Sequence, residues 1–220
     1  MSVYMTEAEQ LELIKKWWLR HQTLITVCFA LVVCVVAGYR YWNWHIEKTM
    51  VQASTAYQNM MSASISHDDK AVQSYANQLI RENDKTVYGT TAHLMLAKLF
   101  VNQKDYQKAE QELSHVAQNA KVDALKQLAT IRLARLQLSQ KQYDKAIAEL
   151  STIHNSPYAT VVNELKGDIY SAKGDYLNAD ASYQSALTEL ASNGGANLLL
   201  EMKHNEVKAL IDSHPDKKTA

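Results

Sequence analysis

Cysteine, proline and glycine are all scarce in this 220-residue chain. Its two cysteines, Cys28 and Cys34, lie in the first 40 residues, so no disulfide can form in the remainder. The two prolines and six glycines leave long stretches rich in Ala, Leu, Gln, Lys and Glu, which favour helix. Apolar residues recur there at helical spacing, and no alternating strand pattern of useful length is present. The sequence therefore predicts an all-α fold.

Charge is absent between Arg20 and Arg40, where the sequence contains no Asp, Glu, Lys or Arg. The residues from His21 to Tyr39 would form a helix about 28 Å long, close to the ~30 Å thickness of a bilayer core. All four tryptophans flank this stretch, at positions 17, 18, 42 and 44. Trp favours the membrane–water interface, because its ring has an apolar body and a polar edge. We expect residues 21–40 to form one transmembrane helix.

Basic residues predict the direction of this helix. Lys15, Lys16 and Arg20 precede it, whereas only Arg40 and Lys48 follow it closely. The positive-inside rule places the side with more basic residues in the cytoplasm. We therefore expect residues 1–20 to be cytoplasmic and residues 41–212 to be on the far side of the membrane, which in a Gram-negative bacterium is the periplasm.

Two other interpretations of the apolar stretch are a cleaved signal peptide and a lipoprotein anchor. Val35 and Ala37 fit the small residues of a signal-peptide cleavage site, but a mature chain would then open on the bulky segment 39–42. A lipoprotein anchor fits poorly, because Val precedes each cysteine where a small residue is expected. An uncleaved anchor remains the preferred interpretation.

Positive charge is not concentrated after residue 40. Four of the 23 basic and three of the 23 acidic residues fall in the first 40 positions, so the remainder is nearly neutral. The basic stripe that nucleic-acid binding requires is not visible. The chain also lacks HExxH and CxxC zinc spacings, phosphate-binding glycine loops and the G-x-S-x-G motif. We expect no catalytic residue, cofactor or metal, and we expect His93 to pack in the core.

Three similar segments repeat along the chain, each centred on a tyrosine: Tyr106, Tyr143 and Tyr176. They are 37 and 33 residues apart, close to the 34-residue period of the tetratricopeptide repeat (TPR), which is a pair of helices. Small residues recur at the positions where the two helices of each pair approach closely. These are Ala97 and Ala109, then Ala134 and Ala146, then Gly167 and Ala179.

The last repeat matches the pattern best. Tyr170 and Tyr183 fall where large side chains fill the space between neighbouring pairs, and Gly174 begins the turn. A weaker fourth unit is expected near Ala71 and Tyr75. A helix at about 196–211 is predicted to cap the final exposed face, as stacked repeats require, and residues 213–220 are predicted to be a disordered tail.

The first helices of stacked pairs line the concave face of such a solenoid. If Ala97, Ala134 and Gly167 are equivalent, this face carries a mixed apolar and charged set that suits an extended or helical peptide: Leu94, Lys98, Val101, Ile131, Arg135, Leu138, Glu164 and Asp168. The alternative is that these side chains pack on a neighbouring helix or face water. A second predicted surface lies on the membrane helix, where small residues four apart permit close helix packing: Thr26, Ala30, Cys34 and Gly38.

The chain resembles the YfgM-type ancillary subunits of the bacterial Sec translocon over nearly its whole length. The resemblance rests on the acidic N-terminus and single anchor, and on four short segments: 39–43 (YRYWN), 56–59 (AYQN), 86–89 (TVYG) and 132–135 (RLAR). It implies an inner-membrane protein with a periplasmic TPR-like domain and no catalytic residues.

The same resemblance implies three kinds of partner: Sec translocon subunits, a membrane-anchored parvulin-like chaperone of the PpiD type, and translocated client proteins. The expected role is to assist or recruit chaperones, with binding and effective concentration as the mechanism. Two other functions remain open, a scaffold for an envelope assembly complex unrelated to secretion and an uncharacterised hydrolase.

Overall fold

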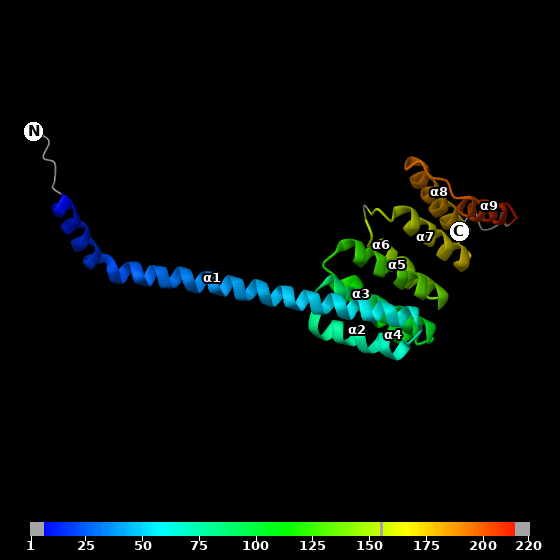
Figure 1. Cartoon of the computed structure of the whole chain (residues 1–220). Coiled ribbons are helices and arrows are strands. Elements are labelled where there is room, and N and C mark those ends of the chain that lie inside the picture. The colour runs from blue at the N-terminus through cyan, green and yellow to red at the C-terminus, as the bar shows by residue number, and fades with distance from the viewer. Residues whose placement is uncertain (1–6, 155, 214–220) are drawn as a thin grey trace, which may run out of the picture. The chain divides into compact units, whose positions relative to one another are not determined.

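The computed structural model describes residues 7–154 and 156–213, and these residues form α-helices and no strand. The predicted all-α class is therefore confirmed for this part of the chain. The helices follow one another as shown in Figure 1: α1 (Glu7–Ile65), α2 (Asp69–Asn83), α3 (Val87–Asn102), α4 (Tyr106–Asn119), α5 (Asp123–Ser139), α6 (Tyr143–Ser151), α7 (Ala159–Lys173), α8 (Tyr176–Ser192) and α9 (Leu198–Ser213). The chain divides into two compact units, Met1–Gln52 and Ala53–Ala220.

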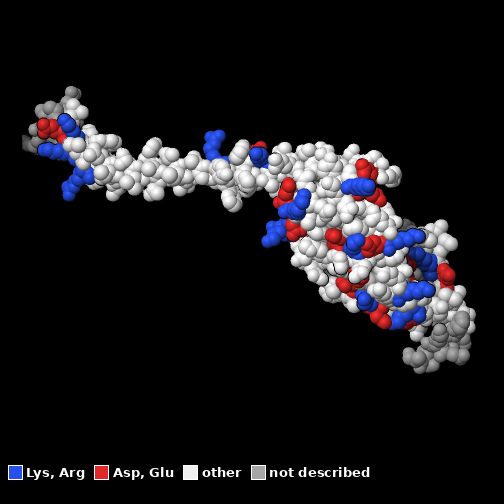
Figure 2. Space-filling model, turned by 90° about the horizontal axis from the view of Figure 1, so that it is seen from below, with Lys and Arg blue, Asp and Glu red and all other residues white. Residues whose placement is uncertain are grey.

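The first unit exposes large apolar side chains along α1. Phe29 is 70 % exposed, and Val35 and Trp42 are also exposed. Figure 2 shows a length of this helix without charged atoms on the face drawn. Within the described residues, one helical segment, Thr26–Ile65, is long and apolar enough to cross a membrane. The predicted span at 21–40 overlaps this segment.

The second unit is a series of helix pairs. Its first pair consists of the end of α1 and α2, which is the expected fourth unit, and the others are α3 with α4, α5 with α6, and α7 with α8. Figure 1 shows the pairs following one another in chain order. Positive and negative side chains are interspersed over the visible surface of this unit in Figure 2.

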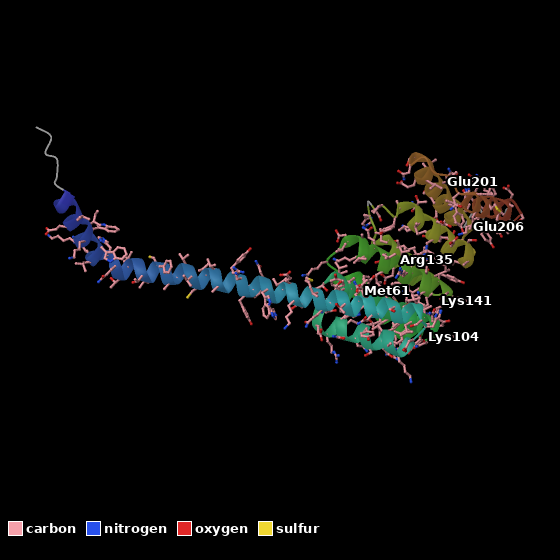
Figure 3. The ribbon with its side chains drawn as sticks, in the orientation of Figure 1. Met61, Lys104, Arg135, Lys141, Glu201 and Glu206 are labelled. Carbon is pink, nitrogen blue, oxygen red and sulfur yellow. The ribbon has the colours of Figure 1, made fainter. Side chains whose placement is uncertain are left out.

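The two helices of each pair are joined by a turn of one recurring form. One residue in each turn has a left-handed backbone, with φ between 57° and 84°: His67, Lys104, Lys141 and Gly174. The amide of the next residue donates to a carbonyl five positions back. This bond gives a partner to one of the last carbonyls of the first helix, which has none inside the helix. Figure 3 places Lys104 and Lys141 in corresponding turns at the same end of their helix pairs.

Aspartate begins the second helix of three pairs. The side chains of Asp68, Asp105 and Asp175 each accept a hydrogen bond from the amide three residues on. Such N-caps satisfy an amide that has no partner inside the helix. In the third pair Gln142 takes this position and makes no capping hydrogen bond.

Small residues allow the paired helices to pack closely, and Ala97, Ala109, Ala134, Ala146 and Ala179 are all buried. The buried apolar side chains fall into three clusters along the stack. The last cluster joins α8 to α9 and contains Ala179, Tyr183, Ala186, Leu200 and Val207.

Helix α9 covers the last pair, as predicted for a capping helix. It runs two residues later than expected at each end, since the expected range was 196–211 and α9 is Leu198–Ser213. Of the predicted tail, Ser213 ends α9, and residues 214–220 lie outside the described part of the chain.

Candidate peptide-binding groove

A hollow of about 490 Å³ opens among α3, α4 and α5. Helices α3 and α5 are the first helices of consecutive pairs, and each presents one face because its lining residues recur three or four positions apart. Eleven residues line the hollow: Leu94, Ala97, Lys98, Val101, Asn102, Tyr106, Leu113, Arg132, Arg135, Leu136 and Ser139.

The floor of this groove is apolar. Leu94, Leu113 and Leu136 are buried, and Ala97 leaves space because its side chain is a single methyl group. Val101 is partly open to water, with 38 % of its surface exposed. Such a floor gains free energy when apolar side chains of a ligand cover it.

The rim of the groove is positive. Lys98, Arg132 and Arg135 line it, and none of the eleven lining residues is acidic. Lysine and arginine form charge-assisted hydrogen bonds with carboxylates, and the guanidinium of Arg can bind both oxygens at once. The arrangement can hold a peptide that combines apolar side chains with a carboxylate.

Comparison with known proteins shows what the chain is related to. The model of the tetratricopeptide repeat-like domain family matches residues 15–209. A curated relative from Aggregatibacter actinomycetemcomitans, named ancillary SecYEG translocon subunit, is 34 % identical over 186 residues, which cover 84 % of this chain and 91 % of that protein. The chain belongs to the family of YfgM-type ancillary SecYEG translocon subunits.

Other relatives carry the same name. The Escherichia coli K12 protein is 32 % identical over 187 residues, or 85 % of this chain and 90 % of that protein. The Neisseria gonorrhoeae protein is 29 % identical over 218 residues, which cover 94 % of this chain and all of that protein. The family resemblance predicted from the sequence is therefore confirmed.

Four of the eight concave-face residues predicted for this YfgM-type chain line the groove: Leu94, Lys98, Val101 and Arg135. Ile131 and Leu138 instead belong to the middle core cluster, Ile131 as a buried member and Leu138 as a partly buried one. The role of all eight in binding a partner stays a prediction.

The other two predicted residues, Glu164 and Asp168, contact the capping helix. Lys203 of α9 donates to Glu164 Oε1 at 2.8 Å and lies 2.9 Å from Asp168 Oδ1. The hydroxyl of Tyr183 also donates to Asp168 Oδ1, at 2.7 Å. These carboxylates are therefore engaged within the domain.

Seven groove residues were not predicted to line the concave face: Ala97, Asn102, Tyr106, Leu113, Arg132, Leu136 and Ser139. Arg132 and Leu136 lie on the same face of α5 as the predicted residue Arg135, so helical spacing could have predicted Arg132 and Leu136 as well. Tyr106 was predicted only as a repeat residue. It opens α4, and the turn before it brings its ring to the groove.

The predicted packing face of the membrane helix lies on α1. Thr26, Ala30, Cys34 and Gly38 are all exposed, and a Cβ atom added at Gly38 would meet nothing within 4 Å. Contact with another membrane helix stays a prediction. Elsewhere, three potential metal ligands come together in the described residues, although the sequence predicts no metal: Asp84, His93 and His115.

Proposed function

We propose that the chain is a membrane-anchored adaptor that associates with the Sec translocon and binds other proteins without catalysing a reaction. The relatives named ancillary SecYEG translocon subunits support the association. The exposed apolar surface of α1 supports an anchor, because water disfavours such a surface and lipid accepts it.

The proposed orientation has residues 1–20 in the cytoplasm and the repeat domain in the periplasm of a bacterial inner membrane. The excess of basic residues before the apolar stretch supports it. Protease added to spheroplasts should degrade the repeat domain and leave a short membrane fragment. Protection of that domain until the membrane is lysed would contradict the orientation.

The groove is the proposed binding site for a partner segment, and it is the observation that carries the adaptor role. Its three cations and apolar floor favour a peptide with apolar side chains and a carboxylate. We propose two sources of that peptide: a parvulin-like membrane-anchored chaperone of the PpiD type and translocated client proteins. Holding them beside the channel raises their effective concentration there.

The adaptor role can be tested by site-specific crosslinking in native membranes. A photoreactive amino acid replaces Val101 in the groove, and a matched control carries it at Gln184, which is exposed on α8. We expect partner adducts from position 101 but not from position 184. Adding Lys98→Glu and Arg135→Glu should reduce those adducts by about tenfold, since each reverses a groove charge.

The adducts also distinguish the proposed role from the alternative. Recovery of Sec subunits, a periplasmic chaperone or secreted clients supports a role in translocation. Recovery of envelope-assembly proteins alone would favour the scaffold function instead. Lys145→Glu on α6 together with Lys208→Glu on α9 serves as the control, because this pair of exposed charge reversals changes the net charge by the same amount.

A further inference from the structure

Two histidines and two carboxylates from separate helices meet beside the second helix pair. Asp84 follows α2, His93 lies in α3, and Glu112 and His115 lie on one face of α4. Nε2 of His93 is 3.0 Å from Asp84 Oδ1, and Nε2 of His115 is 3.4 Å from the same oxygen. The two imidazole rings are stacked, with centroids 4.2 Å apart.

Potential ligand atoms of Asp84, His93 and His115 all lie within 4.8 Å of one another. In a tetrahedral Zn²⁺ site with bonds of about 2.0–2.1 Å, neighbouring ligand atoms are about 3.3 Å apart. The two measured nitrogen-to-oxygen separations lie on either side of this value. The stacked rings do not direct both nitrogen lone pairs at one point, so the site requires His115 to rotate out of the stack. Its side chain is 40 % exposed and has room to do so.

Glu112 supplies a second and independent indication of a metal site. Its Oε2 is hydrogen-bonded to Nδ1 of His93, so the carboxylate fixes the orientation of the ring and leaves Nε2 directed at Asp84. Histidines that bind metals through one nitrogen commonly donate from the other to a carboxylate. The buried imidazole of His93 has this arrangement: Nδ1 faces the carboxylate of Glu112, and Nε2 faces the proposed metal position beside Asp84.

A hollow of about 180 Å³ adjoins the cluster and gives access from solvent. It has space for a water molecule as a fourth ligand. Its lining includes three of the cluster residues and two lysines: Asp84, Lys85, Thr90, His93, His115, Val116, Asn119, Ala120 and Lys121. With neutral imidazoles the two carboxylates sum to two negative charges, which a divalent cation neutralises.

We propose that Asp84, His93 and His115 bind one Zn²⁺ ion, and that Glu112 is the positioning residue for His93. The ion would link α2, α3 and α4, which all contribute to the first core cluster. When no metal is bound, the two ring nitrogens of His93 contact Glu112 and Asp84, and the Nε2 contact holds a proton at the position that the metal would take. Zinc and protons therefore compete for the site, as they do for other histidine ligands.

The test uses untagged full-length protein in detergent, stripped with a chelator and titrated with zinc chloride by calorimetry. We expect one equivalent to bind. His115→Ala, a change at a half-exposed residue, should abolish this binding, while Glu112→Gln should weaken it by about 10–100-fold and keep the stoichiometry. His154→Ala, at an exposed histidine outside the cluster, should bind like the wild type.

Circular dichroism of each variant confirms that it is folded, so loss of binding is not mistaken for unfolding. Absorption of the Co²⁺-substituted protein gives a separate readout, because tetrahedral coordination produces strong visible bands that should vanish in His115→Ala. Failure of the wild type to bind Zn²⁺, or equal binding by folded wild type and His115→Ala, would overturn the proposal.

Discussion

A Cβ atom at Gly167 would lie 2.5 Å from the ring of Tyr183. The backbone of α7 thus approaches the tyrosine of α8 more closely than any other residue type permits. Tyr183 is buried, and its hydroxyl donates to Asp168 one residue beyond Gly167. This contact fixes the spacing of the last helix pair.

Gly167→Ala should therefore destabilise the domain, although alanine is the better helix former. We expect a net loss of about 1–3 kcal/mol, because overpacking forces the tyrosine ring or the helix to shift. Chemical denaturation of the full chain followed by circular dichroism measures this loss. Adding Tyr183→Leu should recover part of it, and strictly additive losses would contradict a direct clash.

Alkaline pH should weaken the contact between the last pair and the capping helix. Burial, together with the hydrogen bond to Asp168, raises the pKa of Tyr183. Burial lowers the pKa of Lys203, but its hydrogen bonds to Glu164 and Asp168 outweigh this effect and raise it. Both groups favour the protonated form in the folded state, so the stability they provide is present at neutral pH and is lost as the pH rises above about 10.

Tyr183→Phe tests this pH dependence. At neutral pH it should cost about 1 kcal/mol, the usual contribution of a buried hydrogen bond. Above about pH 10 Tyr183 ionises in the unfolded wild type and stabilises that unfolded state, whereas phenylalanine cannot ionise. The difference in free energy of unfolding between the two proteins should therefore shrink. Denaturation curves across the alkaline range measure the difference, and a constant gap would count against this account.

Gln142→Asp should stabilise the third helix pair. The other pairs have a capping aspartate at this position, whereas Gln142 leaves its buried Oε1 without a partner among the described residues. A new N-cap should contribute about 1 kcal/mol. Thermal unfolding compares this variant with Gln142→Ala, which removes the same amide without capping the helix and should give no such gain.

Lys104→Gly and Lys141→Gly should each stabilise the protein by about 0.5–1 kcal/mol. Both lysines have φ near 60°, a conformation that strains any residue with a Cβ atom, and Gly174 occupies the equivalent turn without strain. The gain is measured by chemical denaturation. Gly174→Ala, the reverse change, should be destabilising, and a gain there would contradict the role given to backbone strain.

Ala30→Leu together with Gly38→Leu should lower the recovery of membrane partners in a pull-down. The added volume would block a neighbouring helix from packing on the small residues of α1. Val32→Leu with Val36→Leu enlarges the opposite face and serves as the matched control. If the Ala30 and Gly38 variant recovers as much partner as the wild type does, this face has no docking role.

The repeat pattern was readable in the sequence because each repeat carries its own helix-pair signals. Tyr106, Tyr143 and Tyr176 marked the second helices, and Gly167 and Ala179 marked a close approach that the structure confirms. Four of the eleven groove residues followed from assuming equivalent positions in the repeats. These features depend on the spacing of residues that are close in the chain, and that spacing can be read from a single sequence.

Contacts between particular side chains of different helices could not be predicted from the sequence. The approach of His93 to His115 depends on how α3 and α4 rotate against each other, and helical spacing does not specify that rotation. Similarly, Lys203 reaches Glu164 only because α9 docks in one particular register. A capping helix lies outside the repeat pattern, so its partners could not be assigned in advance.

The division of the buried residues into three clusters has a consequence for how the domain tolerates damage. Stability in such a stack is a sum over adjacent units, and no single nucleus of contacts holds all of it. Fraying of α9 would expose the side chains of its own cluster while those around the groove stay in contact. The C-terminal end of the domain can therefore unfold locally or vary in sequence without disrupting the groove among α3, α4 and α5.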